Sequence, residues 1–306
     1  MADIDRTTEN NMNKLRGFAE KIAAYPTTVL IEGETGTGKE VMANLIHQSS
    51  NRKTMPFIKI NCGAMPEGLI ESELFGYEKG AFTGAKREGN PGLFELAHKG
   101  TLLLDEISEL SKSMQVKVLR VLQDREIRRV GGSWSKSIDV RIIASTNQNL
   151  LMLVDEGRFR KDLYYRLNIG YIRVPPLRER RSEIEPLAKY FIEMNNEEFD
   201  LKKRFNIETM EVLKAYDYPG NIRELRNIIE IACISSNEEE IFPRDLPEHL
   251  VTSMESDEDG LEAMVERLEK VEIVKALACE SSIRQAALRL KISNATMLRK
   301  MKKYGI

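Results

Sequence analysis

Seven residues with the pattern G-x-x-x-x-G-K form one segment of the chain: Gly33, Glu34, Thr35, Gly36, Thr37, Gly38 and Lys39. The segment follows an apolar, strand-like run at residues 28–31 and precedes a helical pattern at residues 40–48. Glycines let backbone N–H groups turn around phosphate oxygens, and the following helix directs its N-terminus at them. The Lys39 ammonium adds a compact positive charge, so the pattern predicts a nucleotide phosphate-binding loop.

Two carboxylates, Asp105 and Glu106, follow a second apolar run at residues 101–104. We expect Asp105 to hold Mg²⁺, directly or through water, and Glu106 to polarise the attacking water. Acidic residues often simply leave a strand for solvent, but the phosphate loop upstream favours the catalytic interpretation. ATP and Mg²⁺ are the expected ligands. Glu40 occupies the position where Ser or Thr would ligate Mg²⁺, which leaves part of the metal's coordination open.

Between these two halves lies a segment that has the composition of a loop tip: Gly80, Ala81, Phe82, Thr83, Gly84 and Ala85. Its two glycines permit tight turning, and Thr83 offers a hydroxyl. Phe82 is an aromatic residue that a surface loop has little reason to expose, unless the tip is a contact surface. The pattern alone leaves open an ordinary hairpin whose Phe82 packs back into its own domain.

On this GAFTGA segment the sequence resembles the sigma-54-dependent transcription activators, a branch of the AAA+ ATPases. The resemblance spans nearly all of residues 20–250, with the motifs in the family's order. It implies an α/β fold, in which a parallel sheet covered by helices carries the P-loop and an α-helical lid follows. It also implies that residues 80–85 touch the sigma factor and that the nucleotide state raises or lowers them.

The resemblance assigns roles to four further polar residues. Asn61 matches a residue that restrains the catalytic glutamate, here Glu106, although a strand-end asparagine can also simply satisfy backbone groups. Thr146 and Asn147 match the family's first sensor near the γ-phosphate. Arg223 matches the second sensor, in the lid, and is expected on the bound nucleotide.

Arg160 and Arg166 match the arginines that the family presents to the ATP of a neighbouring subunit. An arginine delivered in this way neutralises charge on the transferred phosphoryl group and is worth roughly 10³ to 10⁵ in rate. The two are six positions apart, which leaves open that one of them joins subunits through salt bridges; we favour Arg166 as the catalytic finger. A site completed by a neighbour requires a ring, by resemblance a hexamer, and predicts concentration-dependent activity.

The arrangement of elements is predicted from periodicity. Between about residues 28 and 172, β-rich runs alternate with helical patterns, which indicates βαβ units and a largely parallel sheet. Beyond Pro175-Pro176 only helical patterns follow, and residues 251–260 form an acidic, Ser-containing stretch typical of a linker. We therefore predict an α/β ATPase subdomain at 1–175, a helical lid at 176–250, a linker at 251–261 and a small all-α domain at 262–306.

The last 26 residues contain no Asp or Glu and seven basic residues: Arg284, Arg289, Lys291, Arg299, Lys300, Lys302 and Lys303. Two helical runs separated by residues 291–293 predict a helix-turn-helix, with Ser293 capping the second helix. The module resembles the Fis-type domain. Its Lys291 stands where that family often has glycine, so we expect a different turn or a cost of about 1 kcal/mol.

Groove geometry places the start of the second helix, Asn294, Ala295 and Thr296, at base edges. The phosphate contacts are assigned to Arg299, Lys300 and Lys303. The expected partner is enhancer DNA, bound by at least a dimer. A basic solvated tail or a dimerisation element is the alternative interpretation.

Composition limits the other possibilities. A formal net charge of -2 excludes a uniformly basic surface. The three cysteines and three histidines are scattered without metal-ligand or disulfide spacing. The N-terminus lacks the apolar core of a signal peptide and no apolar run reaches roughly 20 residues, so we expect a cytoplasmic protein without a membrane partner.

Together these features predict a sigma-54-dependent transcriptional activator. A ring hydrolyses ATP, moves its loops against the sigma-54 RNA polymerase holoenzyme and converts a closed promoter complex into an open one. Two alternatives stay open: a DNA-binding regulator that uses nucleotide only as an assembly signal, and an AAA+ unfoldase or helicase loader with a DNA-binding tail. The chain begins about 30 residues before the P-loop, so control is expected from a separate protein or from a longer regulator of which this chain is a fragment.

Overall fold

The computed structural model describes residues 2–81, 88–250, 269, 273, 276–277 and 283–304, with the backbone alone for residues 2–11 and 302. It divides into two compact units. The first comprises residues 1–204 and 217–240, and the second comprises residues 205–216 and 241–306. Within the described part of the chain, no helix combines the length and apolarity that crossing a bilayer requires.

The first unit is built on a five-stranded sheet in the order β2-β5-β8-β1-β9. Every pairing in it is parallel, as the alternating pattern predicts. The strands are β1 (Val29–Glu32), β2 (Phe57–Asn61), β5 (Thr101–Asp105), β8 (Arg141–Thr146) and β9 (Gly170–Arg173). Parallel strands need crossover connections, so their carboxyl ends meet at one edge of the sheet, where ligands bind in open α/β folds.

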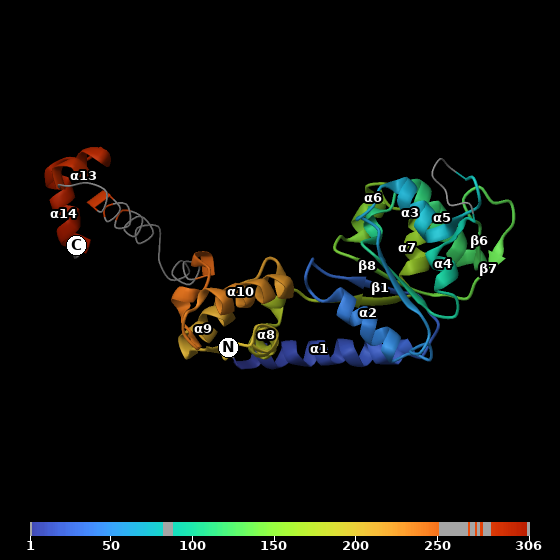
Figure 1. Cartoon of the computed structure of the whole chain (residues 1–306), viewed down its shortest axis with the longest axis horizontal. Coiled ribbons are helices and arrows are strands. Elements are labelled where there is room, and N and C mark those ends of the chain that lie inside the picture. Colours follow the sequence, from blue (N-terminus) through green and yellow to red (C-terminus); the bar gives the residue numbers. More distant parts are fainter. Residues whose placement is uncertain are drawn as a thin grey trace. The chain divides into compact units, whose positions relative to one another are not determined.

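Helices cover both faces of this sheet (Figure 1). One face packs on the long N-terminal helix α1 (Ala2–Ala23) and on α2 (Lys39–Gln48), through a core that includes Ile31 and Leu103. The opposite face packs on α3 (Glu67–Phe75), α5 (Lys112–Asp124), α6 (Leu150–Asp155) and α7 (Lys161–Leu167). Leu102 and Leu104 lie in this second core while Leu103 lies in the first, because successive strand residues point to opposite faces.

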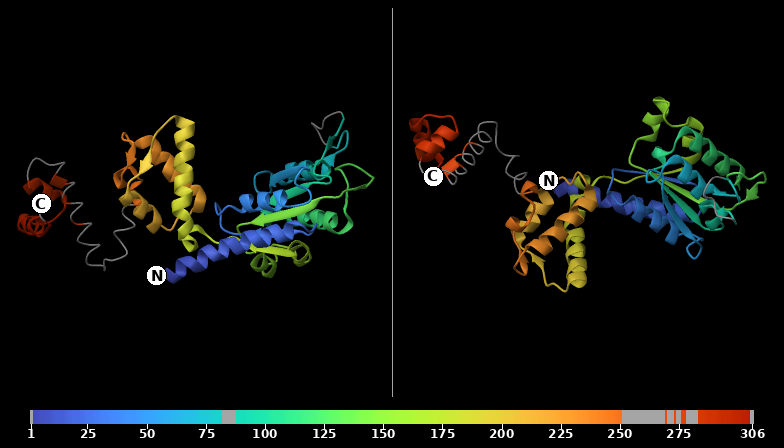
Figure 2. Two further views of the ribbon diagram at one scale, coloured as in Figure 1. Left: turned by 90° about the horizontal axis from the view of Figure 1, so that it is seen from below. Right: turned by 45° about the horizontal axis from the view of Figure 1, so that its top comes forward.

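Short elements complete the first unit. The antiparallel pairs are β3 (Gly76–Tyr77) with β4 (Asn90–Pro91) and β6 (Glu126–Ile127) with β7 (Lys136–Ser137). Single helical turns occur at α4 (Leu93–Leu96), η1 (Ile107–Glu109), η2 (Leu177–Glu179) and η3 (Arg181–Glu183). Helices α8 (Ile184–Phe199) and α10 (Asn221–Ser235) pack together in the same unit, and Figure 2 gives two further views of these elements.

The buried Arg141 ties the end of α1 to the sheet. Its guanidinium donates to the carbonyl of Ala23 at 2.7 Å and to that of Ile22 at 3.0 Å. Burial lowers the pKa of Arg141 to about 10, with a smaller contribution from Arg52, so the side chain still carries its charge at neutral pH. The last carbonyls of α1, which have no partner within the helix, are thereby satisfied.

The second unit contains α9 (Ile207–Ala215), η4 (Pro243–Asp245), α13 (Ile283–Arg289) and α14 (Asn294–Tyr304). Two-residue strands, β10 (Arg204–Phe205) and β11 (Glu240–Ile241), stand at the boundaries of the two units. The prediction that only helices follow Pro176 is therefore wrong at these four residues. Such short strands carry no periodicity that a sequence pattern can reveal.

The helix-turn-helix prediction is confirmed by α13 and α14. A small core of Ala286, Ala287 and Met297 holds the two helices together with Ile273 and Ala276. Ser293 caps α14 as predicted, since its hydroxyl accepts the N–H of Thr296 at 3.1 Å.

Candidate functional site

The P-loop lies between β1 and α2 at the carboxyl edge of the sheet. Gly36 and Gly38 have φ values of 79° and 96°, a region that favours glycine. The Lys39 ammonium donates to the carbonyls of Gly33 at 2.8 Å and Glu34 at 3.1 Å. Burial lowers the pKa of Lys39, and the carboxylates of Asp105 and Glu106 oppose that shift. The lysine is therefore held inside the loop, close to the predicted catalytic acids.

The strand register brings the other predicted residues to the same edge. Asn61 pairs with Asp105 across β2 and β5, and Thr146 pairs with Glu32, the residue before the P-loop. Asn147 donates through Nδ2 to the hydroxyl of Thr35 at 3.2 Å. The predicted sensor thus contacts the predicted phosphate loop, although more than a hundred residues separate them.

Asp105 and Glu106 differ in their surroundings. Asp105 accepts a hydrogen bond from the Ser145 hydroxyl at 2.6 Å, which orients its carboxylate. Glu106 has a φ of 54°, a left-handed conformation that costs a residue with a Cβ about 1–2 kcal/mol. Strain of this kind clusters at functional sites, where the surrounding structure holds it in place.

The side chains of Asn61 and Glu106 both lie next to Gly63. The Asn61 side-chain oxygen accepts the N–H of Gly63 at 2.8 Å. A Cβ added to Gly63 would lie 2.8 Å from Glu106 Oε2 and 3.4 Å from Asn61 Oδ1. In this structure Asn61 satisfies a backbone group, as the strand-end interpretation expects, and it lies beside the carboxylate that the resemblance says it restrains.

Glu40, the departure from the usual P-loop pattern, points to a neighbouring strand. Its carboxylate forms an ion pair with Lys59 of β2 at 2.6 Å. Lys59 also lies over the Phe57 ring, 5.2 Å from its centroid. One carboxylate oxygen of Glu40 is therefore bonded to a lysine of the sheet.

Two site residues were missed by reasoning from the sequence. Asn221 is wholly buried; its oxygen accepts the N–H of Leu177 at 2.8 Å and its amide donates to the carbonyl of Thr35 at 3.1 Å. Arg180, only 3% exposed, donates to the carbonyl of Thr37 at 2.6 Å. The sequence pattern around Asn221 indicates only a helix start, and Arg180 lies in a charged run that resembles a solvated surface.

Arg223, the predicted second sensor, lies against the P-loop. Its Cβ is 3.2 Å from the position that a Cβ on Gly36 would occupy. Its positive charge adds to the lowering of the Lys39 pKa, after the larger effect of burial. Arg223 therefore acts electrostatically on the P-loop lysine.

The two predicted trans-acting arginines have partners within their own chain. Arg160 pairs with Asp162 at 2.7 Å. Arg166 donates to the carbonyl of Leu122, near the end of α5, at 2.9 and 3.2 Å. Among the described residues neither arginine hydrogen-bonds to the P-loop, and Arg166 lines a separate hollow of about 300 Å³.

The base of the predicted contact loop joins a second loop. The N–H of Glu78 donates to the carbonyl of Val130 at 3.0 Å, and the N–H of Val130 donates to Gly76 at 2.9 Å. Gly80 has a φ of 76°, and Ala81 lies against Gly131. The remaining predicted contact residues lie outside the described residues: Phe82, Thr83, Gly84 and Ala85.

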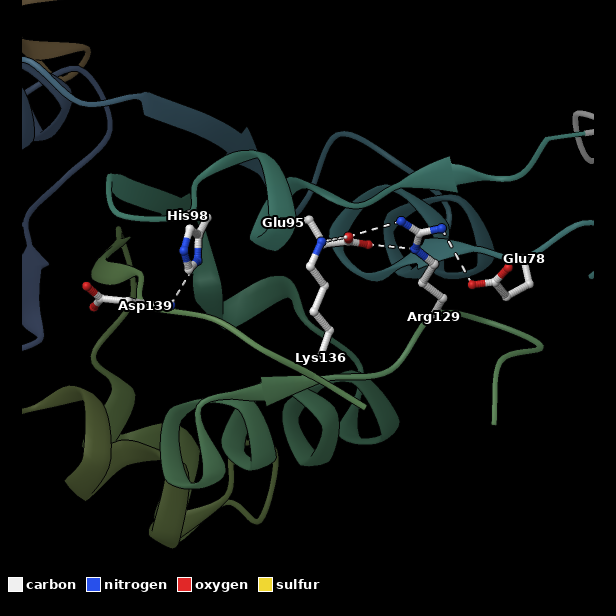
Figure 3. A network of polar contacts seen from close by, with 6 residues as sticks. All are labelled: Glu78, Glu95, His98, Arg129, Lys136 and Asp139. Carbon is white, nitrogen blue, oxygen red and sulfur yellow. Dashed lines mark hydrogen bonds and ion pairs between the residues drawn. The ribbon is translucent and has the colours of Figure 1, made fainter. Parts of the chain in front are cut away.

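Side chains reinforce this junction (Figure 3). Arg129 makes two hydrogen bonds to Glu95, at 2.7 and 3.0 Å, and a longer contact of 3.5 Å to Glu78. Lys136 also reaches Glu95, at 2.7 Å. Burial raises the pKa of Glu95, but Arg129 and Lys136 together outweigh burial and hold it below its usual value. His98, further along the same segment, accepts the N–H of Asp139 at 3.2 Å.

The predicted DNA-contacting residues divide into two groups. Asn294, Ala295 and Arg299 are exposed at one surface of α14. Lys300 instead forms an ion pair with Glu269, whose carboxylate also accepts the hydroxyl of Tyr304 at 2.6 Å. A phosphate contact by Lys300 would require this pair to open. Thr296 shares a hydrogen bond of 2.8 Å with Ser293, and Lys303 lies over the Tyr304 ring.

Three family models match consecutive parts of the chain. A sigma-54 interaction domain matches residues 6–173, an AAA+ ATPase lid domain matches residues 178–263, and a helix-turn-helix domain matches residues 258–306. The domain boundaries predicted above stay predictions.

Two similar proteins carry the names of regulators. The chain is 45% identical to regulatory protein AtoC of Escherichia coli (strain K12), over 94% of this chain and 64% of that protein. It is 46% identical to a signal-transduction and transcriptional-control protein of Clostridium beijerinckii, over 96% of this chain and 47% of that protein. The chain thus spans between about half and two thirds of the length of these relatives.

Solved structures agree with the fold. The structure of NtrX from Brucella abortus in complex with ADP is 34% identical, with a TM-score of 0.74 over 96% of this chain and 68% of that chain. The same protein in complex with ATP gives a TM-score of 0.73. The two domain matches and these structures together show that the chain is an AAA+ P-loop ATPase with an α/β sheet domain and a lid.

Proposed function

The chain belongs to the family of sigma-54 interaction domains, and on that basis we propose that it hydrolyses ATP to remodel RNA polymerase carrying sigma-54. One observation carries the proposal. The P-loop, the acid pair and the first sensor lie at one edge of the sheet, and the Asn147 amide contacts Thr35 of the P-loop directly. The loop that begins at Gly80 leaves the same domain, with its base joined to a second loop.

In the proposed reaction the P-loop binds the phosphates through its N–H groups. Lys39 leaves the carbonyls of Gly33 and Glu34 and donates to phosphate oxygens, which replace those weaker acceptors. Glu106 polarises the attacking water and accepts its proton as the water oxygen bonds to the γ-phosphorus; the bond from the γ-phosphorus to the bridging oxygen breaks, and ADP leaves with that oxygen. Asn147 and Arg223 lie close enough to the loop to sense the γ-phosphate.

The donors at the strand ends fit Mg²⁺, which prefers oxygen ligands. Asp105 would hold the ion, directly or through water, and the Ser145 hydroxyl orients its carboxylate. When bound, Mg²⁺ neutralises charge on the phosphate oxygens.

We assign Arg166 to the ATP of the neighbouring subunit, with Arg160 at the same interface. Both are held by weak surface partners, a carbonyl for Arg166 and an exposed carboxylate for Arg160. Exchange of such a partner for a phosphate is favourable, because an exposed pair contributes little. The active species is then a ring, with a hexamer as the proposed form.

Residues 80–85 are the proposed contact with sigma-54. Asn61, the proposed switch on the catalytic Glu106, lies beside it, while Glu95 and Arg129 hold the base of the loop. The C-terminal domain, residues 262–306, is the proposed binding element for enhancer DNA, with Asn294 and Arg299 on its exposed surface. From these proposed partners we infer that the protein acts in the cytoplasm.

The test is open-complex formation on a sigma-54 promoter with the purified chain, ATP and polymerase holoenzyme. ATP hydrolysis is followed in parallel, and Thr83→Ala is the paired variant. We expect the wild type to open the promoter and the variant to hydrolyse ATP without opening it. Vigorous hydrolysis by both proteins with no open complex from either would remove the sigma-54 assignment and favour a nucleotide-assembled regulator or an unfoldase.

A further inference from the structure

The P-loop accepts hydrogen bonds from residues that follow the sheet in the chain. Three of its consecutive carbonyl groups are bonded in this way. The donors are the Asn221 amide to Thr35 at 3.1 Å, the Ile222 N–H to Gly36 at 3.0 Å, and the Arg180 guanidinium to Thr37 at 2.6 Å. No two of these carbonyls share a donor, so each peptide plane of this stretch is held separately.

The orientation of these carbonyls decides where the loop's N–H groups point. In a trans peptide the C=O of one residue and the N–H of the next lie in one plane and point in opposite directions. Holding the carbonyls of Thr35, Gly36 and Thr37 therefore directs the N–H groups of the residues that follow them to the opposite side, where the N–H of Thr37 donates to the Glu34 carbonyl at 3.4 Å in this structure. Inward N–H groups are what a P-loop offers to phosphate oxygens.

Both side-chain donors are built into the interior. Asn221 is 0% exposed and Arg180 is 3% exposed. Asn221 also accepts the N–H of Leu177 at 2.8 Å, and Arg180 also pairs with Glu183 at 3.0 Å. Buried polar groups are costly unless they are bonded, so these contacts hold residues 177–180, which follow the sheet, and the P-loop together.

The backbone is closely packed where the P-loop meets the start of α10. A Cβ added to Gly36 would lie 2.3 Å from the carbonyl oxygen of Gly220. The start of α10 and the turn of the P-loop are thus in direct contact. A change in one backbone is transmitted to the other without an intervening side chain.

We propose that Asn221 and Arg180 are positioning residues for nucleotide binding, which fix the P-loop's N–H groups from the carbonyl side without touching the nucleotide. The inference rests on the proposed function, because it assumes that the P-loop binds ADP and ATP. It deepens that function by coupling residues 177–180 and α10 to phosphate binding. A movement of α10 that shifts these carbonyls then changes the affinity for nucleotide. By the same coupling free energy, bound nucleotide shifts the equilibrium between positions of α10.

The experiment measures the dissociation constant of ADP by calorimetry, and the kcat and KM of ATP hydrolysis, on the full chain. The variants are Arg180→Met, Arg180→Lys and Asn221→Asp. Asn221→Asp is nearly isosteric; it keeps the acceptor for Leu177 but loses the donor to Thr35 and adds a charge beside Glu34. Arg181→Gln is the matched control, because Arg181 directly follows Arg180 and pairs with Asp217 at the surface.

We expect Arg180→Met and Asn221→Asp to weaken ADP binding about tenfold or more, with a parallel rise in KM. Arg180→Lys should recover part of the loss, because an ammonium can still donate to Thr37. Arg181→Gln should bind within about twofold of the wild type. Melting temperatures, measured on the same samples, separate a folding defect from a binding defect.

Wild-type affinity for ADP in both Arg180→Met and Asn221→Asp would overturn the inference while leaving the proposed function intact. The inference also fails if the variants melt at lower temperatures but keep wild-type ADP affinity well below those temperatures. Failure of the wild type itself to bind ADP would instead refute the proposed function.

Discussion

Lys291, two residues beyond the end of α13, has a backbone conformation that glycine adopts more readily. Its φ is 58°. The N–H of Lys291 donates to Leu288 and the N–H of Ile292 donates to Ala287, each at 3.0 Å, which is the Schellman pattern of helix ends. The sequence left open a different turn or a strained one, and the structure has the left-handed conformation.

The gain from Lys291→Gly can be worked out from this geometry. The left-handed conformation costs a residue with a Cβ about 1–2 kcal/mol. Glycine loses more freedom on folding, which costs about 0.5–1 kcal/mol relative to alanine. The midpoints of these two ranges differ by about 0.75 kcal/mol, so we expect a net stabilisation of the helix pair by about 0.5–1 kcal/mol, provided that the Lys291 side chain, which is exposed, contributes little.

Amide hydrogen exchange of the α13 and α14 peptides measures this in the full chain. We expect exchange in Lys291→Gly to slow by roughly two- to fivefold, because protection scales with the free energy of local opening. Lys291→Ala is the control, since it removes the same charge but keeps the Cβ. If the glycine variant exchanges no more slowly than the alanine variant, the reasoning from backbone strain is wrong.

Three further predictions concern the nucleotide site. Glu106→Gln should lower ATP hydrolysis by about 100-fold or more while calorimetry shows ADP binding nearly unchanged; a variant with wild-type turnover would contradict the role of Glu106. Gly36→Ala should abolish measurable ADP binding in the same assay, because φ is 79° and the new Cβ would lie 2.3 Å from the Gly220 carbonyl; wild-type affinity would show that the loop can relax. Arg178 lowers the pKa of Glu34 from 4.5 to about 2, so their pair stabilises the fold above about pH 4.5 and is lost as pH falls toward 2. The difference in urea midpoint between wild type and Glu34→Gln should therefore shrink between pH 6 and pH 3.5, and a constant difference would argue against the pair.

The network at the base of the contact loop gives the loop a defined starting point. Glu95 is nearly buried, with 4% of its side chain exposed, and holds both Arg129 and Lys136. A bidentate arginine–carboxylate pair has a fixed geometry, so it holds the loop that carries Arg129 in a defined position against α4. None of these three residues was singled out by the sequence, because each is an ordinary charged residue in a charged chain.

The sequence by itself determined the sheet and the phosphate loop. The β-rich runs expected from the sequence, at residues 28–31, 57–60, 101–104, 140–144 and 170–174, correspond to the five strands within two residues at each end. Apolar runs that are buried on both faces, followed by glycines and carboxylates, are local patterns, and local patterns need no knowledge of the fold. The α13 and α14 pair was likewise readable, since its cap and its turn lie within three consecutive residues.

Only the tertiary structure decided which polar residues serve the site. Asn221 and Arg180 reach the P-loop from more than a hundred positions away, and Lys300, predicted on phosphate, is held by Glu269. A side chain's partner depends on which segments the fold brings together and on what burial does to an unpaired polar group. Spacing along the chain contains neither quantity, so an asparagine at a helix start and an arginine in a charged run gave no sign of their contacts.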